Sequence, residues 1–125
     1  ADVIVGAKTQ SLILLEEEMK AVGNVYITTD DGSYGIHGFT TDILKNVIDE
    51  VDMVCSCGPM PMLKALAAIC KEHNTPCQVS LEERMGCGIG ACLVCACKTL
   101  DKDGNVEHSH VCKKGPVYNA EEVVW

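Results

Sequence analysis

The chain has 125 residues, 47% of them hydrophobic and only 4% aromatic, so one domain or two small halves can bury a largely aliphatic core. Its net charge of −8 argues against binding nucleic acid or an anionic membrane, because both need a concentrated basic surface. No apolar run is long enough to span a bilayer, and no signal peptide is visible. Nine cysteines without a secretory signal fit a reducing cytosol better than a disulfide scaffold, which predicts a cytoplasmic location.

The first third of the chain alternates strand and helix patterns. The apolar run Asp2–Gly6 predicts a buried parallel strand, and Thr9 is expected to cap a helix over residues 10–22. A second strand is predicted over Asn24–Asp30, followed by the glycine-rich loop Asp31–Gly38. The residues expected on the inner face of the first helix are Leu12, Leu15 and Met19.

The middle of the chain continues the alternation. Thr40 or Thr41 is expected to cap the second helix, and Asp52–Gly58 predicts a third strand. A third helix is predicted over Met60–His73, and a fourth strand over Pro76–Glu82. Strands that alternate with helices of this length indicate an α/β fold with a parallel sheet and flanking helices.

The pattern changes after Glu82, where glycine and cysteine crowd together in "ERMGCGIGACLVCACKTL". A β-hairpin is predicted beyond this stretch, with strands Cys95–Leu100 and Asn105–Cys112 and a turn at Asp103-Gly104. We therefore predict two parts, an α/β domain over residues 1–82 and a cysteine-rich module over residues 83–125.

Cys87, Cys92 and Cys95 have the C-x4-C-x2-C spacing of plant-type [2Fe–2S] ferredoxins, which add one distant cysteine. Such a loop must turn sharply and point backbone N–H groups at the sulfurs, and glycine permits the positive φ angles that this requires. The glycines between and before these cysteines are Gly86, Gly88 and Gly90.

The fourth ligand is predicted to be Cys112, because antiparallel pairing returns the second hairpin strand to the side of Cys95. Cys97 is the competing candidate, but it lies only two residues after Cys95 on the same face of the strand. Zinc remains an alternative, since His108 and His110 alternate with Cys112, although solvated strand residues are the plainer interpretation. Disulfides or simple burial are further alternatives for the thiols.

The other cysteines have different surroundings. Cys55, Cys70 and Cys77 are expected to serve as small core residues. Cys57 lies at the carboxyl end of a predicted strand, just before a helix, which is where open α/β sheets bind ligands. The sequence leaves open whether Cys57 is structural or lies near a ligand.

Two sets of motifs resemble one known family. "CGIGACLVCACK" followed by "VCKKGPVY" resembles the iron–sulfur electron-transfer subunit of NAD-dependent, class B dihydroorotate dehydrogenases. "TDDGSYGIHGFTTD" and "CGPMPMLKAL" resemble the nicotinamide-binding domain of the ferredoxin reductase superfamily. The resemblance covers nearly the whole chain. Its cysteine motif is specific, whereas the "CGP" turn occurs in many reductases.

The resemblance implies electron flow from NADH through FAD and a [2Fe–2S] cluster to FMN in a catalytic partner subunit, which interconverts dihydroorotate and orotate in pyrimidine biosynthesis. It implies a heterotetramer of two copies of each subunit. The implied cluster ligands are Cys87, Cys92, Cys95 and Cys112. The residues implied on the nicotinamide side are Asp31, Gly32, Ser33, Cys57, Gly58, Pro59 and Met60.

The chain also departs from the family pattern. It opens within a strand pattern and contains neither the flavin-binding β-barrel nor the glycine-rich loop of the nucleotide domain, so we expect a C-terminal fragment whose FAD site lies largely elsewhere. The sheet is expected to lack its first, central strand and to expose edges. A related ferredoxin or sulfide reductase subunit is the alternative, but that branch tends to alter the position of Cys87. A zinc-stabilised interaction module without redox chemistry is the alternative from another class.

Overall fold

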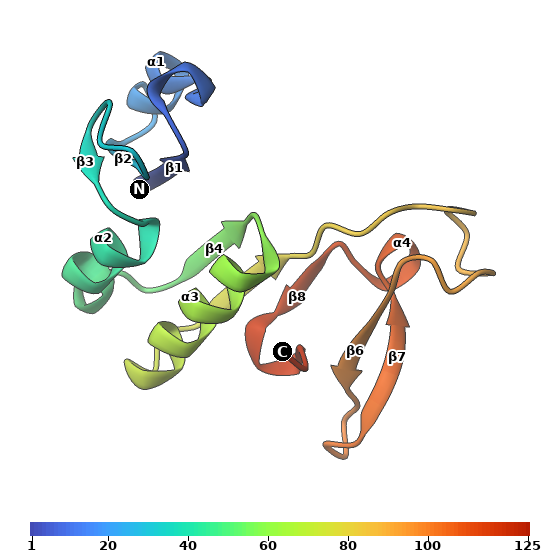
Figure 1. The fold of residues 1–125 in the computed structure, drawn as a ribbon. Coiled ribbons are helices and arrows are strands. Elements are labelled where there is room, and N and C mark those ends of the chain that lie inside the picture. The colour runs from blue at the N-terminus through green and yellow to red at the C-terminus, as the bar shows by residue number, and fades with distance from the viewer. The chain divides into compact units, whose positions relative to one another are not determined.

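The computed structural model describes residues 1–125 and divides them into two compact units, Ala1–Asp49 and Glu50–Trp125 (Figure 1). The predicted boundary after residue 82, between the α/β domain and the cysteine-rich module, falls inside the second unit and stays a prediction. No helix in the structure is both long and apolar enough to cross a membrane.

The first unit contains a three-stranded parallel sheet in the order β1-β2-β3. Strands β1 and β2 pair in register from Asp2 with Asn24 to Ala7 with Thr29, and this confirms both predicted strands. The elements of this part are β1 (Asp2–Ala7), η1 (Gln10–Leu12), α1 (Glu16–Lys20), β2 (Asn24–Thr29), β3 (Ile36–His37), α2 (Thr40–Val47) and, at the boundary, η2 (Ile48–Glu50).

The prediction of one continuous helix over residues 10–22 was wrong. The structure has a 3-10 turn and a five-residue helix instead, separated by Leu15, whose φ of 59° lies in the left-handed region. Leu12 and Leu15 are 57% and 65% exposed, so of the expected apolar face only Met19, which is half-buried, packs against the rest of the structure. Short helices depend on such packing, which accounts for the break. The Thr9 hydroxyl lies 3.2 Å from the Ser33 hydroxyl and does not cap the turn.

The second helix, α2, begins where it was predicted, but with a different cap. Phe39 is the N-cap residue, and its N–H donates to the Asp42 carboxylate at 2.9 Å. Thr40 and Thr41 are the first two helical residues, so the prediction that one of them caps the helix was wrong. The acidic side chain at the third helical position supplies the acceptor in their place.

The second unit is built on β5, which pairs in parallel with β4 and antiparallel with β8. Helix α3 packs on β4 and β5, and a two-stranded hairpin, β6–β7, follows in the chain (Figure 1). The elements of this part are β4 (Val54–Cys57), α3 (Met60–Glu72), β5 (Cys77–Ser80), β6 (Ala96–Leu100), β7 (Val106–His110), α4 (Val111–Lys114), β8 (Val117–Asn119) and η3 (Ala120–Glu122).

The predicted parallel sheet therefore exists as two separate sheets, and β1 and β4 each lie at an edge. The third helix, the strand over residues 77–80 and the hairpin are confirmed. One end of the hairpin differs from the prediction, because Cys112 lies in the short helix α4 that follows β7. Among the cysteines expected in the core, Cys70 is buried and Cys77 is half-buried, whereas Cys55 is exposed.

The core of the second unit joins α3, β5, β8 and the hairpin region. Leu63 of α3 and Val79 of β5 are completely buried at its centre. The core also includes Cys95, one of the predicted cluster ligands, so the cysteine module shares its packing with the sheet. The remaining buried members are Ala67, Leu81, Val111, Tyr118, Ala120 and Val123.

This packing predicts a large stability difference between two substitutions. Leu63→Ala should lower the free energy of unfolding by about 2–5 kcal/mol, because it leaves a cavity at a fully buried site. Val106→Ala, at a side chain that is 58% exposed, should cost less than about 1 kcal/mol. Urea denaturation followed by far-UV circular dichroism measures both, and similar losses would contradict the placement of the core.

Candidate metal centre

The cysteine loop connects β5 to β6 without helix or strand between residues 81 and 95. Gly88 and Gly90 take φ angles of 70° and 79°, in the region that glycine enters without a steric penalty. A Cβ atom at Gly90 would lie 2.9 Å from the Lys113 side chain, so Lys113 packs directly over the loop. The glycines thus let the chain turn around its cysteines and lie close to α4.

Backbone amides of this loop surround the Cys87 sulfur. The N–H groups of Ala91 and Cys92 donate to it at 3.3 and 3.4 Å. Together with the N–H of Ile89, which has the largest effect, they lower the pKa of the Cys87 thiol to about 6. Cys87 is therefore held as a thiolate near neutral pH, which is the form that binds metals.

The four predicted ligand thiols lie as two pairs. The Cys92 side chain lies close enough to Cys87, five residues away in the sequence, to lower the pKa of its thiol. The Cys95 side chain lies close to Cys112 and is the first cause of the raised pKa of the Cys112 thiol. The Gly90 N–H lowers the pKa of the Cys112 thiol and Cys87 raises it, so the two pairs of thiols are neighbours.

The hairpin brings the second pair together as predicted. The N–H of Val111 donates to the carbonyl of Cys95 at 3.1 Å, directly after the last paired residues, Ala96 and His110. Cys112 follows in the first turn of α4. Cys95 is 1% exposed and Cys112 is half-buried, whereas Cys87 lies at the surface.

This arrangement fits a two-iron cluster, in which each iron takes two thiolates. The structure holds no group of three or more His, Cys, Asp and Glu side chains that could hold one metal ion. The donors are soft thiols placed two by two, and backbone N–H groups point at one member of each pair.

Cys97 and the two histidines have other surroundings. The Cys97 thiol donates to the backbone carbonyl of Ser109 at 3.6 Å, and burial raises its pKa. His108 and His110 lie on β7 opposite Lys98 and Ala96, one exposed and the other half-buried. Cys97 therefore has its own partner in the Ser109 carbonyl, while Cys95 also acts on its pKa.

The predicted nicotinamide-side residues of the second unit lie where β4 ends and α3 begins. Gly58 has a φ of 154°, and a Cβ atom there would lie 2.6 Å from the Met62 methyl group. Pro59 is the N-cap residue of α3, and Met60 is its first residue. The Cys57 thiol donates to the Glu82 carboxylate at 3.4 Å.

Glu82 was not among the predicted site residues. A signal for it was present, because a carboxylate two residues after a parallel strand lies at the same sheet edge as the end of the neighbouring strand. The hydrogen bond to Glu82 is the first cause of the raised pKa of Cys57, and burial adds to it. Cys57 is therefore kept as a neutral thiol.

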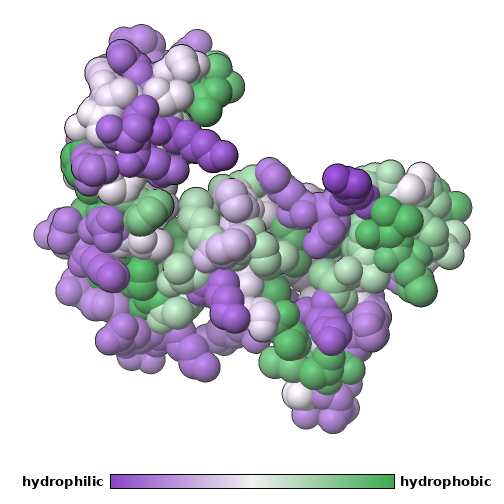
Figure 2. Space-filling model, viewed as in Figure 1, coloured by the Kyte–Doolittle hydropathy of each residue, from purple (hydrophilic) through white to green (hydrophobic).

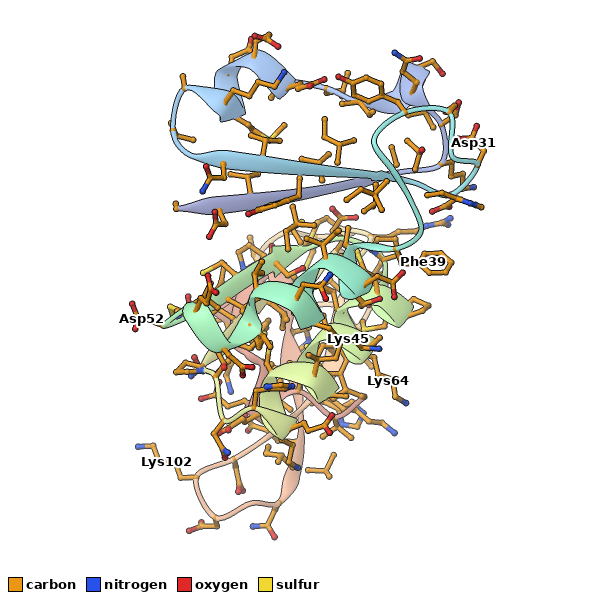
Figure 3. All side chains as sticks on the ribbon, turned by 90° about the vertical axis from the view of Figure 1, so that its left-hand side faces the viewer. Asp31, Phe39, Lys45, Asp52, Lys64 and Lys102 are labelled. Atoms are coloured by element: carbon orange, nitrogen blue, oxygen red, sulfur yellow. The ribbon has the colours of Figure 1, made fainter.

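The predicted nicotinamide-side residues of the first unit form a tight turn after β2, where Asp31 is labelled (Figure 3). The Asp31 carboxylate accepts hydrogen bonds from the Ser33 hydroxyl at 2.6 Å and the Ser33 N–H at 2.9 Å, and these lower its pKa. Gly32 lies between them with a φ of 69°. The Ser33 hydroxyl also accepts the N–H of Gln10 at 2.9 Å.

Comparisons with known proteins agree with this geometry. Residues 82–124 match the family described as the iron–sulfur cluster binding domain of dihydroorotate dehydrogenase B. A "dihydroorotate dehydrogenase B (NAD(+)), electron transfer subunit" from Caldanaerobacter subterraneus subsp. tengcongensis is 46% identical over 123 residues, covering 98% of this chain and 49% of that protein. The protein of the same name from Shouchella clausii is 44% identical, covering 97% of this chain and 46% of its own length.

A solved structure is also similar. A chain from a study of flavin-based electron bifurcation by the NADH-dependent reduced ferredoxin–NADP oxidoreductase aligns with a TM-score of 0.82 and 31% identity. The alignment covers 99% of this chain and 44% of that one. The chain thus spans about half the length of the curated relatives it matches and has the α/β fold of a reductase component.

The contact between Cys57 and Glu82 predicts a change in thiol reactivity. Glu82→Gln removes the negative acceptor that raises the pKa of Cys57, so the pKa should fall and more thiolate should be present at pH 8. Alkylation of Cys57 by iodoacetamide, followed by peptide mass spectrometry, should therefore be faster in this variant. Glu72→Gln, at the other end of α3, is the matched control, and equal rates in all three proteins would contradict the contact.

Proposed function

We propose that this chain is part of a dihydroorotate dehydrogenase B electron transfer subunit, and that it holds a [2Fe–2S] cluster and relays electrons from NADH and FAD to a catalytic partner subunit. The observation that carries the proposal is the arrangement of four thiols in two pairs, within the segment that matches the family's cluster-binding domain. The cluster-binding module is proposed to cover residues 83–125.

The proposed ligands divide by pair. Cys87 and Cys92 hold one iron, and Cys95 and Cys112 hold the other. When bound, such a cluster accepts and donates single electrons, which lets a two-electron carrier communicate with a one-electron step. The chain contributes the thiolates, the backbone N–H groups that stabilise their charge, and the buried position of Cys95.

Residues 1–82 are proposed to form part of an NAD-binding α/β domain. The turn at Asp31, Gly32 and Ser33 and the segment Cys57–Met60 are assigned to the nicotinamide side, each at the carboxyl end of a parallel strand. Most of the FAD site is proposed to lie outside this chain. The Cys57 thiol donates its only hydrogen to Glu82, so it presents a neutral sulfur at this edge of the sheet.

The partner is proposed to dock on the cysteine loop. Apolar side chains gather on this part of the surface (Figure 2), and the exposed members from the loop are Met85 (53%), Ile89 (73%), Leu93 (75%) and Val94 (55%). Apolar residues this exposed around a redox centre favour burial against another protein. The proposed partner is an FMN-containing dihydroorotate dehydrogenase subunit, assembled two and two in the cytoplasm.

The related-reductase alternative is less favoured. Identity to the electron transfer subunits reaches 46%, against 31% to the ferredoxin–NADP oxidoreductase chain, and the family that matches residues 82–124 is that of dihydroorotate dehydrogenase B. A zinc module is less favoured, because zinc sites more often use two C-x2-C knuckles and here only Cys92 and Cys95 form one. Both alternatives are outcomes of the following tests.

The cluster is tested in the full-length subunit that contains this chain, purified anaerobically with its catalytic partner. The parent and Cys97→Ser should contain two irons per subunit and give a rhombic electron paramagnetic resonance signal on reduction. Cys112→Ser should lose most of the iron or change the signal, because one iron loses a thiolate. The rate of electron transfer from NADH to the partner subunit should fall in proportion to the loss of the cluster.

Three results would contradict parts of this proposal. Zinc without iron in the parent would exclude electron transfer through this module. A normal signal in Cys112→Ser with loss in Cys97→Ser would move the fourth ligand to Cys97. A loaded cluster with NADH oxidation but no dihydroorotate or orotate turnover would favour the related reductases.

The docking surface gives a separate prediction. Leu93→Glu should weaken binding of the catalytic subunit by about tenfold or more, which corresponds to about 1.4 kcal/mol, because it places a charge in an apolar interface. Val106→Glu, at an exposed side chain by the hairpin turn, is the matched control. Sedimentation velocity of the mixed subunits measures the dissociation constants, and unchanged binding in Leu93→Glu would exclude this surface.

A further inference from the structure

Tyr118 of β8 lies between the two segments that carry the second thiol pair. It is 8% exposed and pairs with Val79 across the β5–β8 ladder. Its side chain leaves that ladder toward the hairpin, where its hydroxyl lies 3.5 Å from the hydroxyl of Ser109 on β7. Ser109 is 1% exposed, so this contact lies in the interior.

The Tyr118 hydroxyl also reaches the strand that follows Cys95. Cys97 lies opposite Ser109 in the β6–β7 ladder and donates its thiol hydrogen to the Ser109 carbonyl at 3.6 Å. The Tyr118 hydroxyl and the Cys97 thiol each act on the pKa of the other, so the two groups are neighbours, and Cys95 also acts on the hydroxyl. One hydroxyl thus contacts both hairpin strands next to a proposed ligand.

The ring of Tyr118 lies against the segment that carries Cys112. A Cβ atom added at Gly115 would lie 2.6 Å from Cε2 and 2.9 Å from the hydroxyl oxygen of Tyr118. The Gly115 N–H donates to the Val111 carbonyl at 3.1 Å and closes α4. Glycine at this position therefore permits direct contact between the aromatic ring and the end of the helix that bears Cys112.

We infer that Tyr118 is a positioning residue for the pair Cys95 and Cys112: its ring supports α4 through Gly115, and its hydroxyl contacts the hairpin at Ser109, whose carbonyl accepts the Cys97 thiol. This inference rests on the proposed [2Fe–2S] site. Tyr118 does not bind the metal. It fixes the distance between the two segments that do, and it places a hydroxyl dipole, next to that of Ser109, in the core that contains Cys95.

The hydroxyl dipole of Tyr118 should affect the midpoint potential of the site, which a purely structural residue would not. Reduction adds negative charge to the site, and polar groups nearby stabilise that charge. Removing the hydroxyl without removing the ring should therefore make the site harder to reduce. The midpoint potential should become more negative while the iron content stays the same.

The experiment compares Tyr118→Phe with the parent in the full-length subunit bound to its partner. Iron content, the electron paramagnetic resonance spectrum of the reduced protein and the midpoint potential are measured in each. Tyr118→Phe should keep its iron, shift its g values and lower its potential. Tyr26→Phe, at a half-buried tyrosine of β2 in the other unit, should match the parent in all three.

A second variant tests the ring separately. Gly115→Ala should displace the ring or α4 and broaden the signal or reduce the iron content, because a methyl group has no room. Unchanged spectra and potentials in both Tyr118→Phe and Gly115→Ala, with a loaded cluster in the parent, would overturn this inference alone. A parent without iron would overturn it together with the proposed function. Should Tyr118→Phe fail to fold, Ser109→Ala removes the hydroxyl's partner, and an unshifted potential there would overturn the role of the hydroxyl.

Discussion

The double pairing of β5 is the constraint on which the second unit depends. On one side β5 pairs in parallel with β4, and on the other it pairs antiparallel with β8, which follows the cysteine module in the chain. The N–H of Leu81 then donates to the carbonyl of Pro116 at 2.9 Å, just beyond the last ladder pair, Ser80 and Val117. The end of β5 therefore places Glu82 beside Cys57, the last residue of β4, and the same strand anchors the return of the module.

The same packing explains how a surface loop can hold a defined set of thiols. Cys87 is exposed, but its sulfur is oriented by amides of its own loop. Cys95 is oriented differently, because it is buried in the core with Leu63 and Val79. A local network fixes one pair and long-range packing fixes the other, so the two halves of the site depend on different forces.

The sequence predicted much of this architecture because its signals were local. The turn at residues 103–104 was predictable, since Asp101 accepts the N–H groups of Asp103 and Asn105 at 2.8 Å and Gly104 has a φ of 80°. The cysteine spacing gave the candidate ligands in the same way. The break at Leu15 and the contacts of Tyr118 were not predictable, because they depend on packing between segments far apart in the sequence.

The two thiol pairs differ in the length of chain that each one closes. Cys87 and Cys92 are five residues apart, whereas Cys95 and Cys112 are seventeen apart and are joined only after the hairpin has formed. The longer closure costs about 1 kcal/mol more in chain entropy, and it follows the slower event of strand pairing. We therefore expect the thiols of Cys87 and Cys92 to come together before those of Cys95 and Cys112 as the chain folds.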